Sequence, residues 1–228
     1  MHAETTPPQA ERVEKILEKA GIQQRHAASS LSTWVDRPGT EKGRNAAQEW
    51  ITSPLSDQGF MLLGTPGTGK THLAVAALRG KAEAWVAEQA AEAEREIYYQ
   101  PSAQPVHKMR FLNVPLFLER LRSQMRYSEG EASQLFEYCL DKASVVVLDD
   151  LGKERATDWA SEKLYVLIES RYSACKPTIA TSNRTLDELD DLGYGPAISR
   201  LQHTCRVVRM DAPDYRPRAR AAEDTAAR

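Results

Sequence analysis

Residues 64–71 read Gly64-Thr65-Pro66-Gly67-Thr68-Gly69-Lys70-Thr71, a match to the pattern G-x-x-x-x-G-K-[ST]. Loops of this kind hold the phosphates of a nucleoside triphosphate in backbone N–H groups, and their glycines remove side chains where the backbone meets the oxyanions. In such a loop Lys70 reaches the β- and γ-phosphates, and the hydroxyl of Thr71 binds Mg²⁺. The alternative is a glycine-rich surface turn that binds nothing.

The sequence on both sides of the loop favours the binding site. The apolar run at residues 60–63 is typical of a buried strand. A helix is expected to begin at Lys70, because apolar residues recur at helical spacing through Leu78. A strand, a glycine-rich loop and a helix in this order are the context that a phosphate-binding loop requires. We therefore predict that residues 64–71, together with His72 in the first helical turn, bind ATP and Mg²⁺.

Composition limits the class of protein. The 228 residues carry a formal net charge of −2, so any contact with DNA must come from a local basic patch. Cys139, Cys175 and Cys205 lie far apart without a C-x-x-C pair, which argues against a zinc site and a disulfide framework. No apolar run approaches the ~18 residues of a membrane span, and the N-terminus lacks the features of a signal peptide. These features predict a cytoplasmic protein without membrane contact.

Residues 1–21 are expected to form an N-terminal amphipathic helix. Thr6 would cap this helix, and Gly21 would end it. Its apolar stripe consists of Val13, Ile16, Leu17 and Ala20. The stripe packs either on the domain or against a partner protein, and the sequence leaves both alternatives open.

Strands alternate with helices along the rest of the chain. Strands are expected at residues 60–63, 109–114, 145–148, 178–181 and 206–210. Helices are expected near residues 46–51, 116–125, 135–140 and 158–172. Five short strands that alternate with helices predict an α/β fold with a five-stranded parallel sheet covered on both faces.

Two segments flank or interrupt the predicted core at residues 44–211. Residues 81–107 are rich in Ala and Glu, and we expect a helical extension or hairpin inserted before the second strand. Residues 212–228 are rich in Pro, Arg and Ala, and we expect a basic, disordered tail.

Two aspartates follow the most apolar strand. Asp149 and Asp150 come directly after Val145-Val146-Val147-Leu148. Since the carboxyl ends of parallel strands meet at one edge of a sheet, Asp149 is expected beside the phosphate loop as a ligand to Mg²⁺. Asp150 is positioned to orient or deprotonate an attacking water.

Asn183 and Arg200 each have a functional and a purely structural interpretation. Asn183 follows the strand at residues 178–181, where its amide could bind the γ-phosphate or the water, or where Ser182-Asn183 could cap the next helix. Arg200 could pair with an acidic residue of its own chain, as helix-end arginines usually do. It could also act as an arginine finger on the nucleotide of a neighbouring subunit.

Taken together, these motifs resemble the AAA+ ATPases of the helicase-loader type, DnaC and DnaI, and the related IstB transposition helpers. The resemblance covers about residues 20–216, and its specific blocks are Lys70-Thr71-His72-Leu73-Ala74, Leu148-Asp149-Asp150-Leu151-Gly152-Lys153-Glu154, Ser170-Arg171-Tyr172, Pro177-Thr178-Ile179-Ala180-Thr181-Ser182-Asn183, Ser199-Arg200-Leu201 and Asp214-Tyr215-Arg216.

The resemblance implies a P-loop, AAA+ three-layer sandwich in which Asn183 is the sensor 1 residue and Arg200 the arginine finger acting in trans. It assigns residues 22–43 to a lead-in segment, and matches Gly21-Ile22 and Arg25 to the part of the family's lead-in that lies near the adenine. It also implies that the chain assembles into a homo-oligomer when it binds ATP or DNA.

The sequence departs from the family pattern in two places. Only one amphipathic helix is expected before the core, where loaders usually carry a helicase-binding domain. The C-terminal helical lid of many AAA+ proteins is also expected to be absent, so no sensor 2 arginine is assigned. The shorter side chain of Asp150, where wider AAA+ enzymes have Glu, suggests slow hydrolysis.

Three functions remain open. The first is an ATPase in DNA replication that acts as a helicase loader on single-stranded DNA and a replicative helicase. The second is an IstB-like transposition helper, and the third is an adaptor that binds ATP without hydrolysing it.

A group of basic side chains is a candidate DNA contact. Arg122 and Arg126, with Tyr127 to stack a base, are the candidates named here, against the alternative of a solvated helix face. Phe136 could also stack a base, but a core position is the stronger expectation for it.

Overall fold

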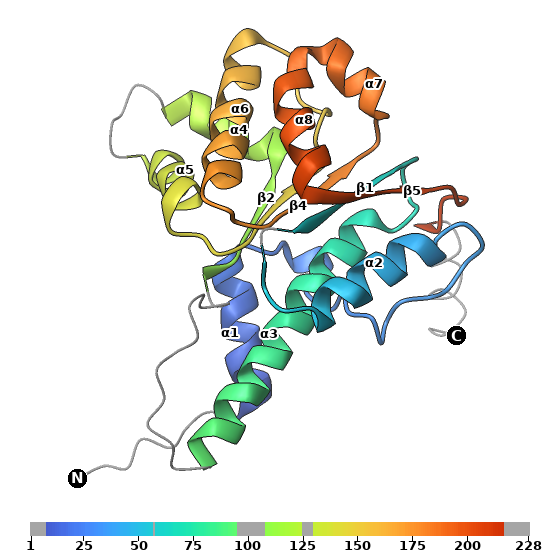
Figure 1. Ribbon diagram of the computed structural model, residues 1–228, viewed down its shortest axis with the longest axis vertical. Helices are drawn as coiled ribbons and strands as arrows, with labels where there is room; N and C mark the ends of the chain where they lie inside the picture. The colour runs from blue at the N-terminus through green and yellow to red at the C-terminus, as the bar shows by residue number, and fades with distance from the viewer. Residues whose placement is uncertain (1–7, 57, 95–107, 125–129, 217–228) are drawn as a thin grey trace, which may run out of the picture.

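The computed structural model describes residues 8–56, 58–94, 108–124 and 130–216 (Figure 1). Its elements are α1 (Gln9–Ala20), η1 (Gln24–His26), α2 (Glu41–Thr52), β1 (Gly59–Gly64), α3 (Lys70–Glu94), β2 (Arg110–Asn113), α4 (Val114–Gln124), α5 (Glu131–Asp141), β3 (Val146–Asp149), α6 (Asp158–Ser173), β4 (Thr178–Ser182), α7 (Leu186–Leu189), η3 (Asp190–Tyr194), α8 (Gly195–Thr204) and β5 (Cys205–Met210).

The five strands form one parallel sheet in the order β2-β3-β4-β1-β5. The register pairs Leu63 of β1 with Ser182 of β4 and with Arg209 of β5, so the carboxyl ends of these strands are level. The predicted fold class is therefore confirmed, and each predicted strand lies within two residues of its observed bounds.

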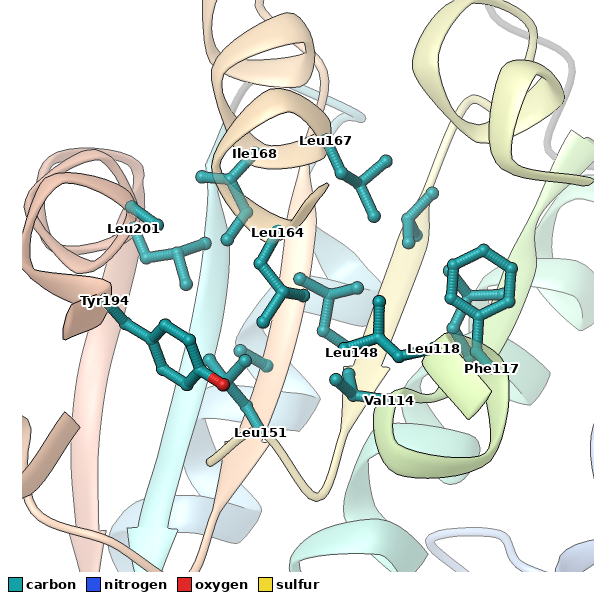
Figure 2. Close-up of a cluster of buried hydrophobic side chains, with 14 of the residues drawn as sticks. Val114, Phe117, Leu118, Leu148, Leu151, Leu164, Leu167, Ile168, Tyr194 and Leu201 are labelled. Atoms are coloured by element: carbon teal, nitrogen blue, oxygen red, sulfur yellow. The ribbon is translucent and has the colours of Figure 1, made fainter. Parts of the chain in front are cut away.

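Alternate residues of the strands face two separate cores, one on each side of the sheet. Val146 and Leu148 of β3 pack with α4 to α8, in the core that Figure 2 shows with Phe117, Leu164 and Leu201. Val147 faces the opposite core, which α1, α2 and α3 complete. Because both faces are covered, β1 and β3 are buried, mostly apolar strands without polar alternation, whereas the edge strand β5 exposes Arg206 and Arg209.

The first helix packs against the phosphate-loop helix. Val13, Ile16, Leu17 and Ala20 are buried in the same core as α3, and Gly21 ends α1 in the left-handed region with φ of 83°. The domain-packing alternative is thus correct for the stripe. The proposed cap Thr6 lies outside the described residues, and Pro8 stands at the start of α1.

The Ala- and Glu-rich segment up to Glu94 continues α3 as one 25-residue helix from Lys70, as expected for a helical extension over these residues. Residues 95–107 of the predicted insertion and 217–228 of the predicted tail lie outside the described residues. The domain boundaries remain predictions. Within the described part of the chain, none of the helices combines the length and apolarity that crossing a membrane would require.

Candidate functional site

The phosphate loop joins β1 to α3 at the carboxyl edge of the sheet, and its glycines sit against other segments of the chain. Gly67 and Gly69 have φ values of 78° and 96°, a region that favours glycine. A Cβ at Gly67 would lie 1.8 Å from Oδ1 of Asp214, and one at Gly69 would lie 2.5 Å from the ring of Trp34. The loop shape therefore depends on glycine for both backbone conformation and space.

Lys70 is buried inside this loop, with 5% of its surface exposed. Its Nζ donates to the carbonyl oxygens of Gly64 and Thr65 at 2.7 and 2.8 Å, and to Oγ1 of Thr68 at 3.3 Å. Burial lowers the pKa of Lys70 to about 8, against the opposing attraction of Asp150 and Asp149. Because the charged amine of Lys70 is poorly solvated here, an anion that binds beside it stabilises it strongly.

The low pKa of Lys70 predicts a pH dependence of ATP binding. Phosphates favour the protonated amine, so above pH 8 the loop must take up a proton as ATP binds. The dissociation constant for ATP is expected to be about tenfold higher at pH 9 than at pH 7, as measured by calorimetry at both values. A Lys70→Arg variant that binds ATP should lack this rise. A dissociation constant that stays flat from pH 7 to 9 would contradict the buried, weakly basic lysine.

Asp149 ends β3 and contacts Thr71, the residue predicted to share its metal ion. Oδ1 of Asp149 accepts hydrogen bonds from Oγ1 of Thr71 at 2.8 Å and Oγ1 of Thr181 at 2.7 Å, and Oδ2 accepts one from Nδ2 of Asn113 at 3.4 Å. Burial raises the pKa of Asp149, and these hydrogen bonds oppose the rise. Thr181 and Asn113 are site residues that the sequence did not identify.

The donor set at Thr71 and Asp149 fits Mg²⁺. A hydroxyl and a carboxylate are the hard oxygen ligands that Mg²⁺ prefers, and this ion usually takes one or two protein ligands with substrate phosphates. Among the described residues no group of three or more His, Cys, Asp or Glu side chains could hold a metal. Water and the oxygens of a bound nucleotide would complete the coordination of an ion held by Thr71 and Asp149.

Asp150 has a left-handed backbone, with φ of 61°, which a non-glycine residue rarely adopts. Its N–H donates to Oγ1 of Thr181 at 3.0 Å. Its carboxylate accepts from Nδ2 of Asn183 at 3.5 Å and from Nζ of Lys153 at 2.9 Å. Strained backbone of this kind clusters at functional sites. The structure thus brings Asp150 and Asn183 together, as their positions at neighbouring strand ends predicted.

Asn183 does not cap the next helix. The N-cap of α7 is Thr185, which forms a capping box with Glu188, so the capping alternative for Ser182-Asn183 is wrong. Ser182 instead donates to the carbonyl oxygen of Leu151 at 2.6 Å and ties β4 to the turn after β3. The amide of Asn183 remains directed at Asp150.

The side chain of His72 contacts the lead-in segment. Its Nε2 lies 2.9 Å from the carbonyl oxygen of Ser30, and its ring centroid lies 5.3 Å from that of Trp34. Burial lowers the pKa of His72, although the Ser30 carbonyl opposes the shift. The imidazole of His72 is thus directed at the lead-in segment, and its predicted contact with ATP remains a prediction.

Three residues beside the loop, which we call the clamp, are Trp34, Arg37 and Tyr215. Arg37 donates to the carbonyl oxygens of Thr68 at 2.9 Å and Pro213 at 2.8 Å. Its guanidinium lies over the rings of Tyr215 and Trp34, 4.8 and 5.9 Å from their centroids. The N–H of Tyr215 donates to the carbonyl oxygen of Gly67 at 3.1 Å.

The clamp bears on two expectations. Residues 212–216, assigned from sequence to a disordered tail, lie against the phosphate loop. Ile22 is partly buried against the core that contains α3, and its expected place near the adenine stays a prediction. The later lead-in residues Trp34 and Arg37 contact the loop itself. The Asp214-Tyr215-Arg216 block was the one sequence signal for this site, but it carried no predicted role.

Arg200 lies within α8 and binds residues of its own chain. Its Nε donates to Oε2 of Glu169 at 2.5 Å, its Nη1 to the carbonyl oxygen of Pro196 at 3.0 Å, and its Nη2 to the hydroxyl of Tyr165 at 3.3 Å. In the single chain the intramolecular alternative therefore holds, and the role in trans remains a prediction.

The candidate DNA contacts are only partly described. The guanidinium of Arg122 lies 5.8 Å from the ring centroid of Trp159, so this residue packs against the start of α6. Arg126 and Tyr127 lie outside the described residues. Phe136 is buried and stacks on Phe117, with the two ring centroids 6.3 Å apart, which confirms the expected core position.

Comparison with known proteins identifies the family of the chain. Residues 45–223 match the family model described as IstB-like ATP binding protein. A Mycobacterium tuberculosis protein named as an ATP-binding protein in insertion sequence is 29% identical over 82% of this chain. The phage-like element PBSX protein XkdC of Bacillus subtilis is 32% identical over 56% of it. The alignments span 66% and 41% of these two relatives, so this chain matches only part of their length.

Solved structures give the same fold. The DnaC helicase loader has a TM-score of 0.62 and 25% identity, and the match covers 82% of this chain and 99% of that one. A structure of DnaI has a TM-score of 0.61 and 19% identity, covering 85% of this chain and 93% of that one. The replication initiator DnaA, bound to AMPPCP and single-stranded DNA, shares the fold with a TM-score of 0.58 and 16% identity over 81% of this chain and 50% of its own.

Proposed function

Because the chain belongs to the family of IstB-like ATP-binding proteins, we propose that it is an AAA+ ATPase that acts in DNA replication in the manner of a helicase loader. ATP binding would favour an assembly of several copies on single-stranded DNA and on a replicative helicase, and hydrolysis would release it. The observation that carries this proposal is the likeness to the DnaC helicase loader, which extends over 99% of that chain.

The residues of the loop would bind and orient the nucleotide. Backbone N–H groups of residues 67–72 and the amine of Lys70 would surround the β- and γ-phosphates. Thr71 and Asp149 would hold Mg²⁺, which when bound neutralises charge on the phosphate oxygens. Their 2.8 Å hydrogen bond supports this assignment, because it holds the two oxygens close enough to share one ion.

Asp150 and Asn183 would act on the attacking water. The carboxylate of Asp150 accepts a proton or orients the water, and the amide of Asn183 holds that carboxylate and the γ-phosphate in register. Lys153, 2.9 Å from Oδ2 of Asp150, fixes the other carboxylate oxygen. Arg200, which binds Glu169 of its own chain, would act in trans on the nucleotide of a neighbouring copy, so the isolated protein is expected to hydrolyse ATP only weakly.

The clamp would contact the base end of the nucleotide, since Trp34 lies against both Gly69 and His72. Stacking of a base on an aromatic ring is worth ~1–3 kcal/mol, so Trp34→Ala is expected to weaken ATP binding about tenfold. Inorganic triphosphate has no base, and its affinity should change less than about twofold by the same reasoning. Titration of both ligands measures the difference.

Trp85→Ala is the matched control, because Trp85 is also on the α3 side of the sheet and packs against the core there. It should leave both affinities unchanged. Equal weakening of ATP and triphosphate by Trp34→Ala would show that Trp34 supports only the loop shape.

The second candidate is a transposition helper. The family description and the Mycobacterium tuberculosis relative in an insertion sequence favour it. Such a protein would assemble on duplex DNA and recruit a transposase. A third candidate, an adaptor that keeps its ATP, would show no turnover with either partner.

Pull-down of the wild-type protein and Lys70→Ala with ATP distinguishes these functions. The loader proposal predicts that wild type retains the replicative helicase of its host, prefers single-stranded DNA and hydrolyses ATP faster with both. Retention of a transposase and preference for duplex DNA would support the second candidate instead. Absence of turnover with helicase and DNA present would support the adaptor.

A further inference from the structure

The pair formed by Glu169 and Arg200 lies between α6 and α8, which run side by side on one face of the sheet (Figure 1). Nε of Arg200 is 2.5 Å from Oε2 of Glu169, while Oε1 of Glu169 accepts from Oγ of Ser173 at 3.1 Å. Both side chains are about one-third exposed, at 31% and 33%. The pair is thus oriented by neighbours but remains reachable from solvent.

Glu169, the partner of Arg200, presents anionic oxygens, as a phosphate does. A carboxylate oxygen on Nε, a carbonyl on Nη1 and the Tyr165 hydroxyl on Nη2 use one donor of each guanidinium nitrogen. Arginine recognises carboxylate and phosphate through the same donors. A nucleotide that needs this guanidinium must therefore compete with Glu169 or accept a negative charge next to its γ-phosphate.

We propose that Glu169 is a positioning residue that withholds Arg200 from the nucleotide of a neighbouring copy, and so sets the protein concentration at which assembly switches hydrolysis on. This inference rests on the proposed function, in which Arg200 acts in trans. The triphosphate carries more charge than one carboxylate and wins the guanidinium once copies assemble. Until then Glu169 suppresses hydrolysis by incomplete assemblies.

The contacts support a reversible restraint. Partly exposed ion pairs are weak, so release of Arg200 is easy when a stronger anion arrives. Ser173 keeps Glu169 hydrogen-bonded after release, which leaves the carboxylate in place to take the arginine back. The hydrogen bond from Arg200 also lowers the pKa of Glu169, so the carboxylate is charged at neutral pH.

The test is the ATPase rate as a function of protein concentration, with single-stranded DNA present, for Glu169→Gln. The amide keeps the size of the side chain but removes the charge that competes with phosphate. We expect the concentration of half-maximal activity to fall about threefold to fivefold, as expected for loss of one weak ion pair. Tyr165→Phe removes the hydroxyl that accepts from Nη2 of Arg200, and it should lower the concentration of half-maximal activity by a smaller factor.

Glu162→Gln is the matched control. Glu162 is on the same helix α6 and exposed, and it pairs with Lys163 and not with Arg200. It should behave as wild type. If Glu169→Gln needs an equal or higher concentration, or loses maximal rate, the inference is overturned. The melting temperature of Glu169→Gln shows whether this variant folds. If it does not fold, Tyr165→Phe replaces it, and the inference is overturned if Tyr165→Phe needs an equal or higher protein concentration than wild type.

Failure of the underlying function has a different signature. If Arg200→Ala keeps full stimulated activity, the role of Arg200 in trans is wrong and the inference falls with it. If Arg200→Ala is inactive while Glu169→Gln matches wild type, only the role of Glu169 is wrong.

Discussion

Replacing Lys70 by alanine is expected to weaken ATP binding at least about 100-fold, because the charge-assisted hydrogen bonds of this amine to the phosphates are lost. The amine lies inside the loop, with its three hydrogen bonds directed at loop oxygens. Its charge is therefore poorly solvated in the free protein and gains much from phosphate. Equilibrium titration with ATP and Mg²⁺ measures the loss.

Lys81→Met provides the matched control on the same helix. Lys81 is also buried and its pKa is also lowered by burial, but its Nζ donates to the carbonyl oxygens of Ile51 and Ser53 at the end of α2. Loss of this amine should lower thermal stability and leave ATP affinity unchanged. A loss of ATP affinity of less than about threefold in Lys70→Ala would be smaller than the contribution of one charge-assisted hydrogen bond. Such a small loss would contradict the assigned site.

Replacing Arg200 by alanine is expected to leave ATP affinity intact and to lower stimulated hydrolysis about 1,000-fold, the lower range for arginine fingers. The reason is geometric: Arg200 binds α6 residues of its own chain and contributes no contact to the loop of that chain. Turnover at saturating ATP with single-stranded DNA measures the change. Arg206→Ala, which removes an exposed arginine paired with Glu49, should have no comparable effect. Parallel losses of binding and turnover would argue for a structural role.

The sheet could be predicted because its signals are local. Continuous apolar runs such as Val145–Leu148 identify strands covered on both faces, and parallel strands place Asp149 and Asn183 at one edge. The same reasoning could not separate a cap from a catalytic amide at Asn183, because the capping box begins two residues later, at Thr185.

The clamp and the Glu169 pair could not be predicted, because their partners are distant in sequence. Arg37 contacts Pro213, which is 176 residues away, and Arg200 contacts Glu169 across 31 residues. Arg171 shows the same limit: it is fully buried and donates to carbonyl oxygens such as those of Cys139 and Pro177. Arg171 thus joins the end of α5 to the segment before β4. In the sequence, the block Ser170-Arg171-Tyr172 indicated only membership of the family.

Mixing two inactive variants tests most directly whether the ATPase site is shared between copies. Lys70→Ala retains Arg200 but has no functional loop, and Arg200→Ala retains the loop but has no arginine to donate. Mixed in equal amounts with single-stranded DNA, they should recover about a quarter of the wild-type rate, the fraction of head-to-tail interfaces that join both intact halves. A mixture no more active than the two variants measured separately would contradict the account.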